Sequence, residues 1–172
     1  MTIDGFTGVH TANKNYIDVR GTYIQNTNTK YIAANIGLRS NLTALIVQNS
    51  NLIEIKAENF FGLQELEYLN LYANKITSLS SDTFSTLTKL KYLILSSNQL
   101  EVIPFNLFSN NLNLEFIDLY NNKIKYVGSG VFDEMKKLKV VYLFGNICVN
   151  ENFINIIQLK EDMKSRCNNP NE

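Results

Sequence analysis

The sequence has few of the residues on which most catalytic sites depend. Its 172 residues include one histidine, His10, two cysteines and no tryptophan. His10 lies in a polar stretch, and the chain has no G-x-S-x-G, P-loop or G-x-G-x-x-G motif. These absences argue against histidine-dependent triads and phosphate-binding loops. Because the acidic residues are scattered, paired-carboxylate catalysis is not indicated either. We therefore expect a protein that is not an enzyme and uses no cofactor.

Net charge and long apolar runs are also missing. Lys and Arg number 16, Asp and Glu number 16, and charged residues make up 19% of the chain. A protein that binds nucleic acid needs a basic surface, so nucleic acid is not an expected partner. No apolar run approaches the ~18 residues of a membrane-spanning helix, and no secretory leader follows Met1. Insertion of this chain into a membrane is not expected.

The two cysteines do not follow a metal-binding pattern. Cys148 and Cys167 lie close together near the C-terminus, without a C-x-x-C motif and without a neighbouring histidine. A structural zinc site needs about four such ligands, so the sequence predicts no metal site.

Leucine, isoleucine and asparagine are abundant, and they recur at one fixed interval along the chain. From residue 42 to residue 148 the chain aligns with itself without a gap. The first apolar column is Leu42, Leu66, Leu90, Leu114 and Leu138, and the second is Leu45, Leu69, Leu93, Ile117 and Val141. A polar column is formed by Ser50, Asn74, Asn98, Asn122 and Asn146, and an aromatic column by Phe60, Phe84, Phe108 and Phe132. Only Asn111 breaks an apolar column, and Leu112 is expected to take its place.

This pattern, L-x-x-L-x-L-x-x-N-x-L with a 24-residue period, is identified as the leucine-rich repeat. A segment such as 68–72 alternates with period two and is therefore a short strand. Stacked units pair these strands in a parallel sheet and bury the leucine faces against one another. The asparagine column satisfies backbone groups at the turn after each strand, and the phenylalanine column fills the convex side. The prediction is an α/β leucine-rich-repeat solenoid with a curved parallel sheet on its concave side, an irregular or short-helical convex side and a C-terminal capping helix.

Both ends of a solenoid need a cap, because an open end exposes the apolar core. We predict an N-terminal cap and degenerate repeat over residues 1–41, repeats over 42–148, and a C-terminal cap and tail over 149–172. A helix is expected over 152–167, capped by Asn150 or Asn152. The side chains expected on its buried face are Phe153, Ile156, Ile157 and Met163.

Cys148 occupies a core column of the last repeat, and Cys167 ends the predicted helix. A disulfide between them would join the cap to the solenoid. The alternative is a cytoplasmic protein with two reduced, buried thiols. We favour the disulfide, because the chain has no other cysteine and both positions suit a cap. The arrangement resembles the C-terminal cysteine cap of extracellular leucine-rich-repeat proteins, shortened to one bridge.

The N-terminal region follows the repeat less regularly. Its residues that match the frame one period earlier are Tyr23, Asn26, Tyr31 and Ile36. Strands over 16–19 and 23–25 are expected to form a hairpin through residues 20–22.

Three stretches, GVHTANKNYIDV, LTALIVQNSNLIEI and NICVNENFINI, resemble secreted leucine-rich-repeat proteins of flies, midges and mosquitoes. The resemblance implies secretion and a role in innate immunity. Secretion would also allow glycosylation of Asn41, which begins the sequon Asn41-Leu42-Thr43. Because the chain is rich in asparagine, a sequon that arises by chance is the alternative.

The outward positions of the predicted strands are the candidate binding site. Seven of these fifteen positions are aromatic, against 11% of the whole chain, and only Asp118 is charged. This composition is typical of an interface core. The candidate protein-binding residues are Tyr68, Tyr72, Tyr92, Phe116, Asp118, Tyr120, Tyr142 and Phe144. The alternative is that the first column, Tyr68, Tyr92 and Phe116, is half-buried beside the leucines and contributes no binding.

Four functions remain open, because a fold does not define a function. The first is a secreted recognition module that binds a protein, or a surface bearing glycans, through the concave sheet. The second is a receptor ectodomain whose membrane segment lies outside this chain. The third is an intracellular scaffold or inhibitor with free thiols. An enzyme is the fourth and the least supported.

Overall fold

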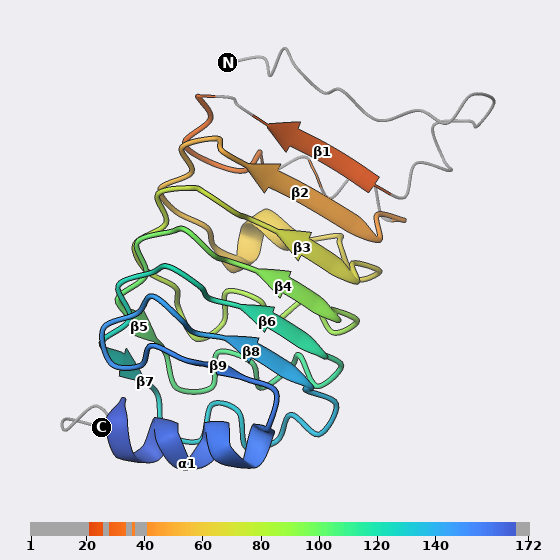
Figure 1. Cartoon of the computed structure of the whole chain (residues 1–172). Helices are drawn as coiled ribbons and strands as arrows, with labels where there is room; N and C mark the ends of the chain where they lie inside the picture. The colour runs from red at the N-terminus through yellow and green to blue at the C-terminus, as the bar shows by residue number, and fades with distance from the viewer. Residues whose placement is uncertain (1–20, 26–27, 34–35, 37–40, 168–172) are drawn as a thin grey trace.

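The predicted solenoid is confirmed in a computed structural model that describes residues 21–25, 28–33, 36 and 41–167. The strands lie one above another like rungs, and the C-terminal helix closes the lower end of the stack (Figure 1). Sheet and convex loops enclose one continuous hydrophobic core. A solenoid of this kind is held together by contacts between neighbouring repeats.

Among the described residues, the main sheet has seven strands. In spatial order they are β1 (Gly21–Gln25), β2 (Ala44–Gln48), β3 (Tyr68–Asn70), β4 (Tyr92–Ile94), β6 (Phe116–Asp118), β8 (Val140–Tyr142) and β9 (Asn152–Phe153). The first six are parallel, and β9 pairs with β8 in the antiparallel direction. From β2 to β8, each residue pairs with the residue one sequence period later, as Leu69 does with Leu93. The sequence period is therefore the strand register.

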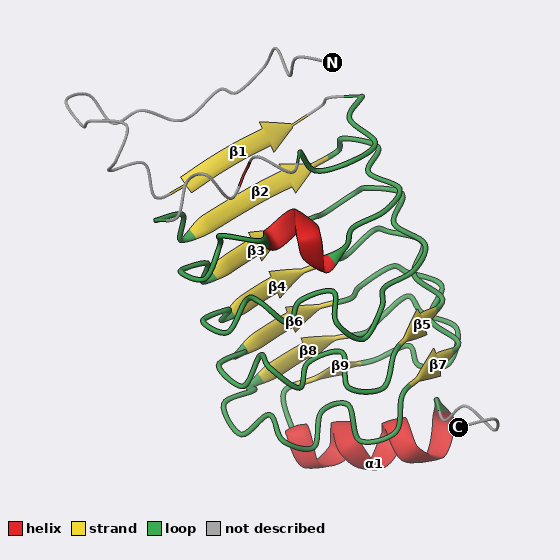
Figure 2. Cartoon of the chain, turned by 180° about the vertical axis from the view of Figure 1, so that it is seen from behind, coloured by secondary structure: helices red, strands yellow, loops and turns green. Residues whose placement is uncertain are grey.

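The convex side is built from turns, a short 3-10 helix, η3 (Ala57–Phe60), and a second parallel pair, β5 (Val102–Ile103) and β7 (Tyr126–Val127). Figure 2 shows η3 and the convex loops in front of the main sheet, with β5 and β7 beside it. The phenylalanine column is buried beneath them. Successive rings lie 6.0, 6.4 and 6.1 Å apart, from Phe60 through Phe84 and Phe108 to Phe132. Each buried side chain of this size contributes about 1.5–3 kcal/mol.

The asparagine column forms a buried ladder of hydrogen bonds, as Asn98 illustrates. Its amide nitrogen donates to the Leu71 carbonyl of the preceding repeat at 3.0 Å and to the Leu95 carbonyl of its own repeat at 2.9 Å. Its Oδ1 accepts from the Ile76 backbone N–H at 3.1 Å. The same bonds recur at Asn74, Asn122 and Asn146. One side chain thus satisfies backbone groups from two repeats.

At Asn111, the expectation that Leu112 would replace it in the core is wrong. Leu112 is 48% exposed, whereas Asn111 is fully buried. The Asn111 amide nitrogen donates to the carbonyls of Phe84 and Leu87, both at 2.9 Å. These bonds offset part of the cost of burying the amide, whose Oδ1 has no hydrogen-bond partner among the described residues, and the repeat keeps its frame without an apolar side chain there.

The N-terminal hairpin predicted through residues 20–22 is contradicted, because Gly21 and Thr22 lie within β1, which pairs with β2 in the parallel direction. The register here is one residue shorter than in the later repeats, since Thr22 pairs with Leu45 and Ile24 with Val47. Thr22 and Ile24 are buried, so the inward positions are one residue away from those that the repeat frame gives. The segment 16–19 and Asn26 lie outside the described residues.

After β1, only one of the two residues that were expected to follow the repeat pattern does so. Ile36 is buried, as predicted, whereas Tyr31 is exposed and the neighbouring Ile32 is buried instead. The first repeat is therefore displaced by one residue through its first turn and returns to the frame at Ile36.

The C-terminal cap differs from its prediction in where the helix begins. α1 spans Ile156–Arg166, and its N-cap is Asn155, whose Oδ1 accepts from the backbone N–H groups of Ile157 and Gln158. Asn152 lies in β9, where its Oδ1 accepts from the backbone N–H groups at the end of β8. The cap therefore adds a short reversed strand before its helix.

The buried face of α1 was also partly misassigned. Leu159 and Met163 are buried, whereas Ile157 is 72% exposed. Phe153 is buried as expected, but it projects from β9 and not from the helix. Met163 is therefore buried as predicted, Leu159 is buried as well, and Ile156 packs half-buried against the core.

The disulfide between Cys148 and Cys167 is present, with the two Cα atoms 5.2 Å apart. Cys167 is completely buried at the end of α1. Its carbonyl accepts from the Val127 backbone N–H at 2.8 Å, which connects the cap to β7. The bridge and this hydrogen bond join the last helix to the convex side of the solenoid.

We predict that Leu95→Ala and Asn98→Ala both destabilise the fold, for different reasons. The first leaves a cavity in a fully buried column and costs about 2–5 kcal/mol. The second leaves backbone groups of Ile76 and Leu71 without partners and costs at least about 1–3 kcal/mol. Urea unfolding measures both, with exposed Asn110→Ala as the control, expected within about 0.5 kcal/mol of wild type. An unchanged midpoint for either core variant would contradict its place in the ladder.

We also predict that reduction destabilises the cap. The chain-entropy model gives a loss of about 3 kcal/mol for a loop of about 20 residues. Alkylation followed by mass measurement, with and without reductant, should show two blocked thiols only after reduction. Thermal unfolding of Cys148→Ser should then match that of the reduced wild type. Two thiols that alkylate freely in the unreduced native protein would exclude the bridge.

Candidate functional site

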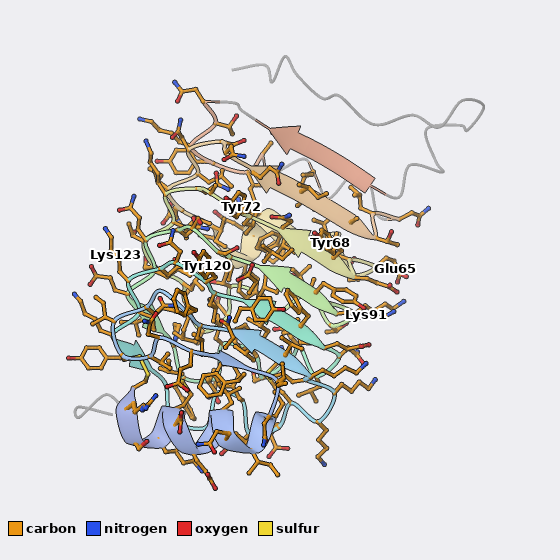
Figure 3. All side chains as sticks on the ribbon, viewed as in Figure 1. Glu65, Tyr68, Tyr72, Lys91, Tyr120 and Lys123 are labelled. Atoms are coloured by element: carbon orange, nitrogen blue, oxygen red, sulfur yellow. A yellow bond between two sulfur atoms is a disulfide. The ribbon has the colours of Figure 1, made fainter. Side chains whose placement is uncertain are left out.

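The candidate site is the concave face, here the sheet face whose side chains point away from the core. Alternation along each strand fixes this direction, because Leu71, Leu119 and Leu143 point inward and are fully buried. Their neighbours Tyr72, Tyr120 and Phe144 are exposed. Tyr72 and Tyr120 project from the side of the sheet where the strands end, opposite the side where the strands begin, which carries Glu65 and Lys91 (Figure 3).

The structure brings four predicted site residues together in the C-terminal half of this face. The Tyr120 and Phe144 rings stack with centroids 6.0 Å apart and 9° between their planes. The Phe116 and Tyr142 rings meet edge to face at 5.2 Å. Aromatic pairs of this geometry hold one another in place while their outer surfaces remain available. Phe116, Tyr120, Tyr142 and Phe144 are called the aromatic cluster below.

The remaining aromatic candidates lie apart from this cluster. Tyr72 is separated from Tyr120 by the rung that carries Ser96, which is buried. Tyr68 and Tyr92 form a pair of their own, with ring centroids 6.3 Å apart. Tyr68 and Phe116 are half-buried, as the alternative for the first column expects, but Tyr92 is 42% exposed.

Asp118 lies on β6, between Phe116 and Tyr120 along the chain, and is held by two hydrogen bonds. Its Oδ2 accepts from the buried Ser96 hydroxyl at 2.7 Å, and its Oδ1 accepts from the Tyr120 backbone N–H at 3.0 Å. Asn70 makes the same second bond to the Tyr72 backbone N–H at 2.9 Å. These short-range bonds fix the backbone from which each exposed tyrosine projects.

The residue after each third-column position turns the chain out of the sheet. Asn49, Ala73, Ser97 and Asn121 have φ between 51° and 56°, in the left-handed region, and Gly145 follows at 81°. Sequence analysis missed this column because its side chains are not of one type. A Cβ on Gly145 would lie 3.2 Å from the Asn121 backbone, so glycine also fits the close approach there.

The side of the sheet where the strands begin, opposite Tyr72 and called the charged edge below, carries ion pairs between successive repeats. Lys89 binds Glu65 at 2.6 Å, Lys91 binds Glu67 at 2.9 Å, and Lys139 binds Glu115 at 2.6 Å. The hydrogen bond from Lys139 holds the pKa of Glu115 below its ordinary value, and the hydrogen bond to Glu67 raises the pKa of Lys91. The signal in the sequence is a pair of opposite charges one repeat apart.

The described part of the chain contains no group of three or more His, Cys, Asp or Glu residues that could hold a metal ion. The described residues also include no helix long and apolar enough to cross a membrane. His10 lies outside the described residues. Asn41 is exposed in the turn before β2, next to the fully buried Leu42, so its amide is accessible to a modifying enzyme.

We predict that Asp118→Ala destabilises the protein by about 1–3 kcal/mol, because it leaves the buried Ser96 hydroxyl without its acceptor. Asn70→Ala is the matched control. It removes the equivalent bond to Tyr72 but leaves no buried hydroxyl without a partner, so a smaller loss of stability is expected. Urea unfolding of both variants measures the difference. Equal losses would contradict a special role for the bond between Ser96 and Asp118.

Comparison with known proteins gives a consistent result. The leucine rich repeat family matches residues 40–100 and 89–147, which together cover more than half of the chain. No curated protein matches the sequence. The leucine-rich-repeat ectodomain of the receptor kinase SOBIR1 from Arabidopsis thaliana is 28% identical, with a TM-score of 0.55 over 67% of this chain and 64% of that one.

A second similar structure is the Toll–Spatzle complex, described as a molecular hub in Drosophila development and innate immunity. It is 20% identical, with a TM-score of 0.70 over 75% of this chain and 18% of that one, and it shows a likeness of fold. The present chain thus spans less than two thirds of either structure. With its 24-residue period, asparagine ladder and parallel sheet, the chain belongs to the leucine-rich repeat family.

Proposed function

We propose that the protein is a non-enzymatic recognition module that binds a protein partner through the C-terminal half of its concave face. The observation that carries the proposal is the aromatic cluster around Asp118. Three of its rings are exposed, Phe116 is half-buried, and the two rings of each pair hold one another on the sheet. Aromatic side chains bury a large area at a low cost in conformational entropy, and a few of them can dominate a protein interface.

The electrostatics of this face favour a protein over a highly charged ligand. Asp118 is the only charged residue among the fifteen outward strand positions. A polyanion such as nucleic acid would need a basic surface to attract it. Asp118, already held by Ser96 and by the Tyr120 backbone, sets the orientation of the partner and contributes little to bulk affinity. Tyr72 extends the contact toward the N-terminal half, and Tyr68 and Tyr92 form its margin.

We further propose that the protein acts outside the cell, in innate immune recognition. The disulfide of the cap favours an oxidising compartment and disfavours an intracellular scaffold with free thiols. The resemblance to secreted dipteran proteins and the likeness to the ectodomain of a receptor kinase support the same location. In that compartment Asn41 carries an N-linked glycan. Its modification would leave the aromatic cluster free, because Asn41 precedes β2 at the other end of the stack.

A receptor ectodomain is the second candidate. The likeness to the ectodomain of a receptor kinase favours it. In either case we propose the division of the chain that the sequence predicts: an N-terminal cap and degenerate repeat over 1–41, repeats over 42–148, and a C-terminal cap helix and tail over 149–172. The sequence of the full-length gene separates the two candidates, because only a receptor has an apolar segment of about 20 residues beyond these repeats.

We predict that Tyr120→Ala and Tyr142→Ala each weaken partner binding by about 1–2 kcal/mol or more. Their side chains are exposed, so thermal unfolding should change little. A partner captured by pull-down is titrated against each variant by calorimetry. The matched control is Tyr126→Ala, because Tyr126 is an exposed tyrosine on β7, outside the concave sheet.

Binding by Tyr126→Ala and by the convex-side variant Lys136→Glu should be normal. The concave assignment fails if Tyr120→Ala and Tyr142→Ala both bind normally while Lys136→Glu abolishes binding.

A further inference from the structure

The charged edge of the sheet combines ion pairs within the chain with a regular alternation of sign from one repeat to the next. Two columns precede the strands. The inner column is Glu67, Lys91, Glu115 and Lys139, and the outer column is Glu65, Lys89, Asn113 and Lys137. Each lysine binds the residue one repeat before it, and Glu115, which lies between two lysines, binds Lys139. Every charge of the inner column therefore has a partner within the chain, and the signs alternate along the whole column.

An alternating column of four charges is complementary to a second copy of itself turned by 180°. In that arrangement Glu67 faces the second copy's Lys139, and Lys91 faces the second copy's Glu115. The outer column obeys the same rule, since Glu65 faces the second copy's Lys137 and Lys89 faces the second copy's Asn113. We infer that this edge of the sheet is a two-fold interface through which two copies of the chain associate in antiparallel orientation.

The charge order also selects this arrangement against its competitors. In a parallel dimer every residue meets its own counterpart, and all charges repel. An antiparallel dimer displaced by one repeat places Lys91 against Lys91 and Glu67 against Glu115. Only the unshifted antiparallel register pairs all four charges of the inner column with opposite charges, and a two-fold interface repeats each favourable contact twice. Like charges in the wrong registers give the interface its specificity.

The wider charge distribution supports the same orientation. Residues 41–115 carry four basic and seven acidic residues, whereas residues 116–167 carry eight basic and six acidic residues. An antiparallel pair therefore places the acidic half of one copy beside the basic half of the other. This long-range attraction favours encounter in the correct orientation.

The edge charges have the exposure and bonding capacity to hold a second partner. The side chains of Glu65, Glu67, Lys89 and Lys91 are between 40% and 52% exposed, that of Lys139 is 71% exposed, and that of Glu115 is 27% exposed. An ammonium has three donors and a carboxylate accepts up to about four bonds, so each pair can enter a four-charge network. The edge is separate from Tyr72 and Tyr120, which project from the opposite side of the sheet (Figure 3).

The inference is tested by sedimentation equilibrium of the full chain. A reversible dimer is expected at about 50 mM NaCl, where exposed charges are weakly screened. Its dissociation constant should rise at least about tenfold at about 500 mM NaCl, because salt screens exposed charges. A monomer at low salt over the whole range of protein concentrations would overturn the inference, as would a dimer that salt does not weaken.

Charge exchange separates the interface from pairing within the chain. Glu67→Lys and Lys139→Glu each place like charges across the dimer and should weaken it at least about tenfold. The double variant Glu67→Lys/Lys139→Glu restores opposite charges across the dimer, yet it leaves Lys91 and Glu115 each beside a like charge in its own chain. We expect dimerisation to recover while resistance to urea falls. No recovery in the double variant would overturn the inference.

A second double variant serves as the matched control. In Glu115→Lys/Lys139→Glu the two substituted residues still form an ion pair within the chain. Across the dimer, however, position 115 faces Lys91 of the second copy and position 139 faces its Glu67, each with a like charge. This variant should fold with nearly wild-type stability and remain monomeric. Tyr120→Ala should dimerise normally, so failure of the concave-face proposal and failure of this inference are distinguishable. A dimer of the control variant as strong as wild type would overturn the inference.

Discussion

The buried asparagine ladder is the interaction on which the rest of the structure depends. The chain must leave the sheet after each short strand, and the turn leaves carbonyl and N–H groups inside an apolar core. Unpaired groups there would cost about 1–3 kcal/mol each. Asn98 pairs such groups in its own and the preceding repeat, so every repeat is specified by its neighbour. Leucine burial supplies the driving force for folding, and the ladder sets the spacing of the buried leucines along the chain.

Much of this fold was accessible from the sequence because side-chain period and strand register are the same quantity. The inward columns and the phenylalanine stack followed from aligning the chain with itself, and the disulfide from the places of the only two cysteines at the C-terminal cap. Prediction failed where a different local interaction decided the outcome. Asn111 remains in an apolar column because two carbonyls accept from its amide. At β1 the step shortens by one residue, and no gap in the pattern marked it.

The residues of the candidate site could be predicted from the sequence, but the contacts between them could not. Alternation along the strands identified the outward side chains, yet only coordinates separate the aromatic cluster from Tyr72, which lies beyond the buried Ser96. The bond of Asp118 to Ser96 was likewise not visible, because it joins two different columns on neighbouring rungs. Periodicity gives the direction of a side chain, whereas its contacts depend on its neighbours' conformations.

The alternating charges on the sheet edge have a consequence for how such a chain can lengthen. A solenoid of equal units can gain one by duplication without disturbing its strand register. Here a single inserted unit would place two like charges on adjacent rungs, as Glu beside Glu or Lys beside Lys. Two units inserted together would restore the alternation from Glu67 to Lys139. The structural unit is therefore a single repeat, whereas the unit by which the gene can grow without electrostatic cost is a pair of repeats.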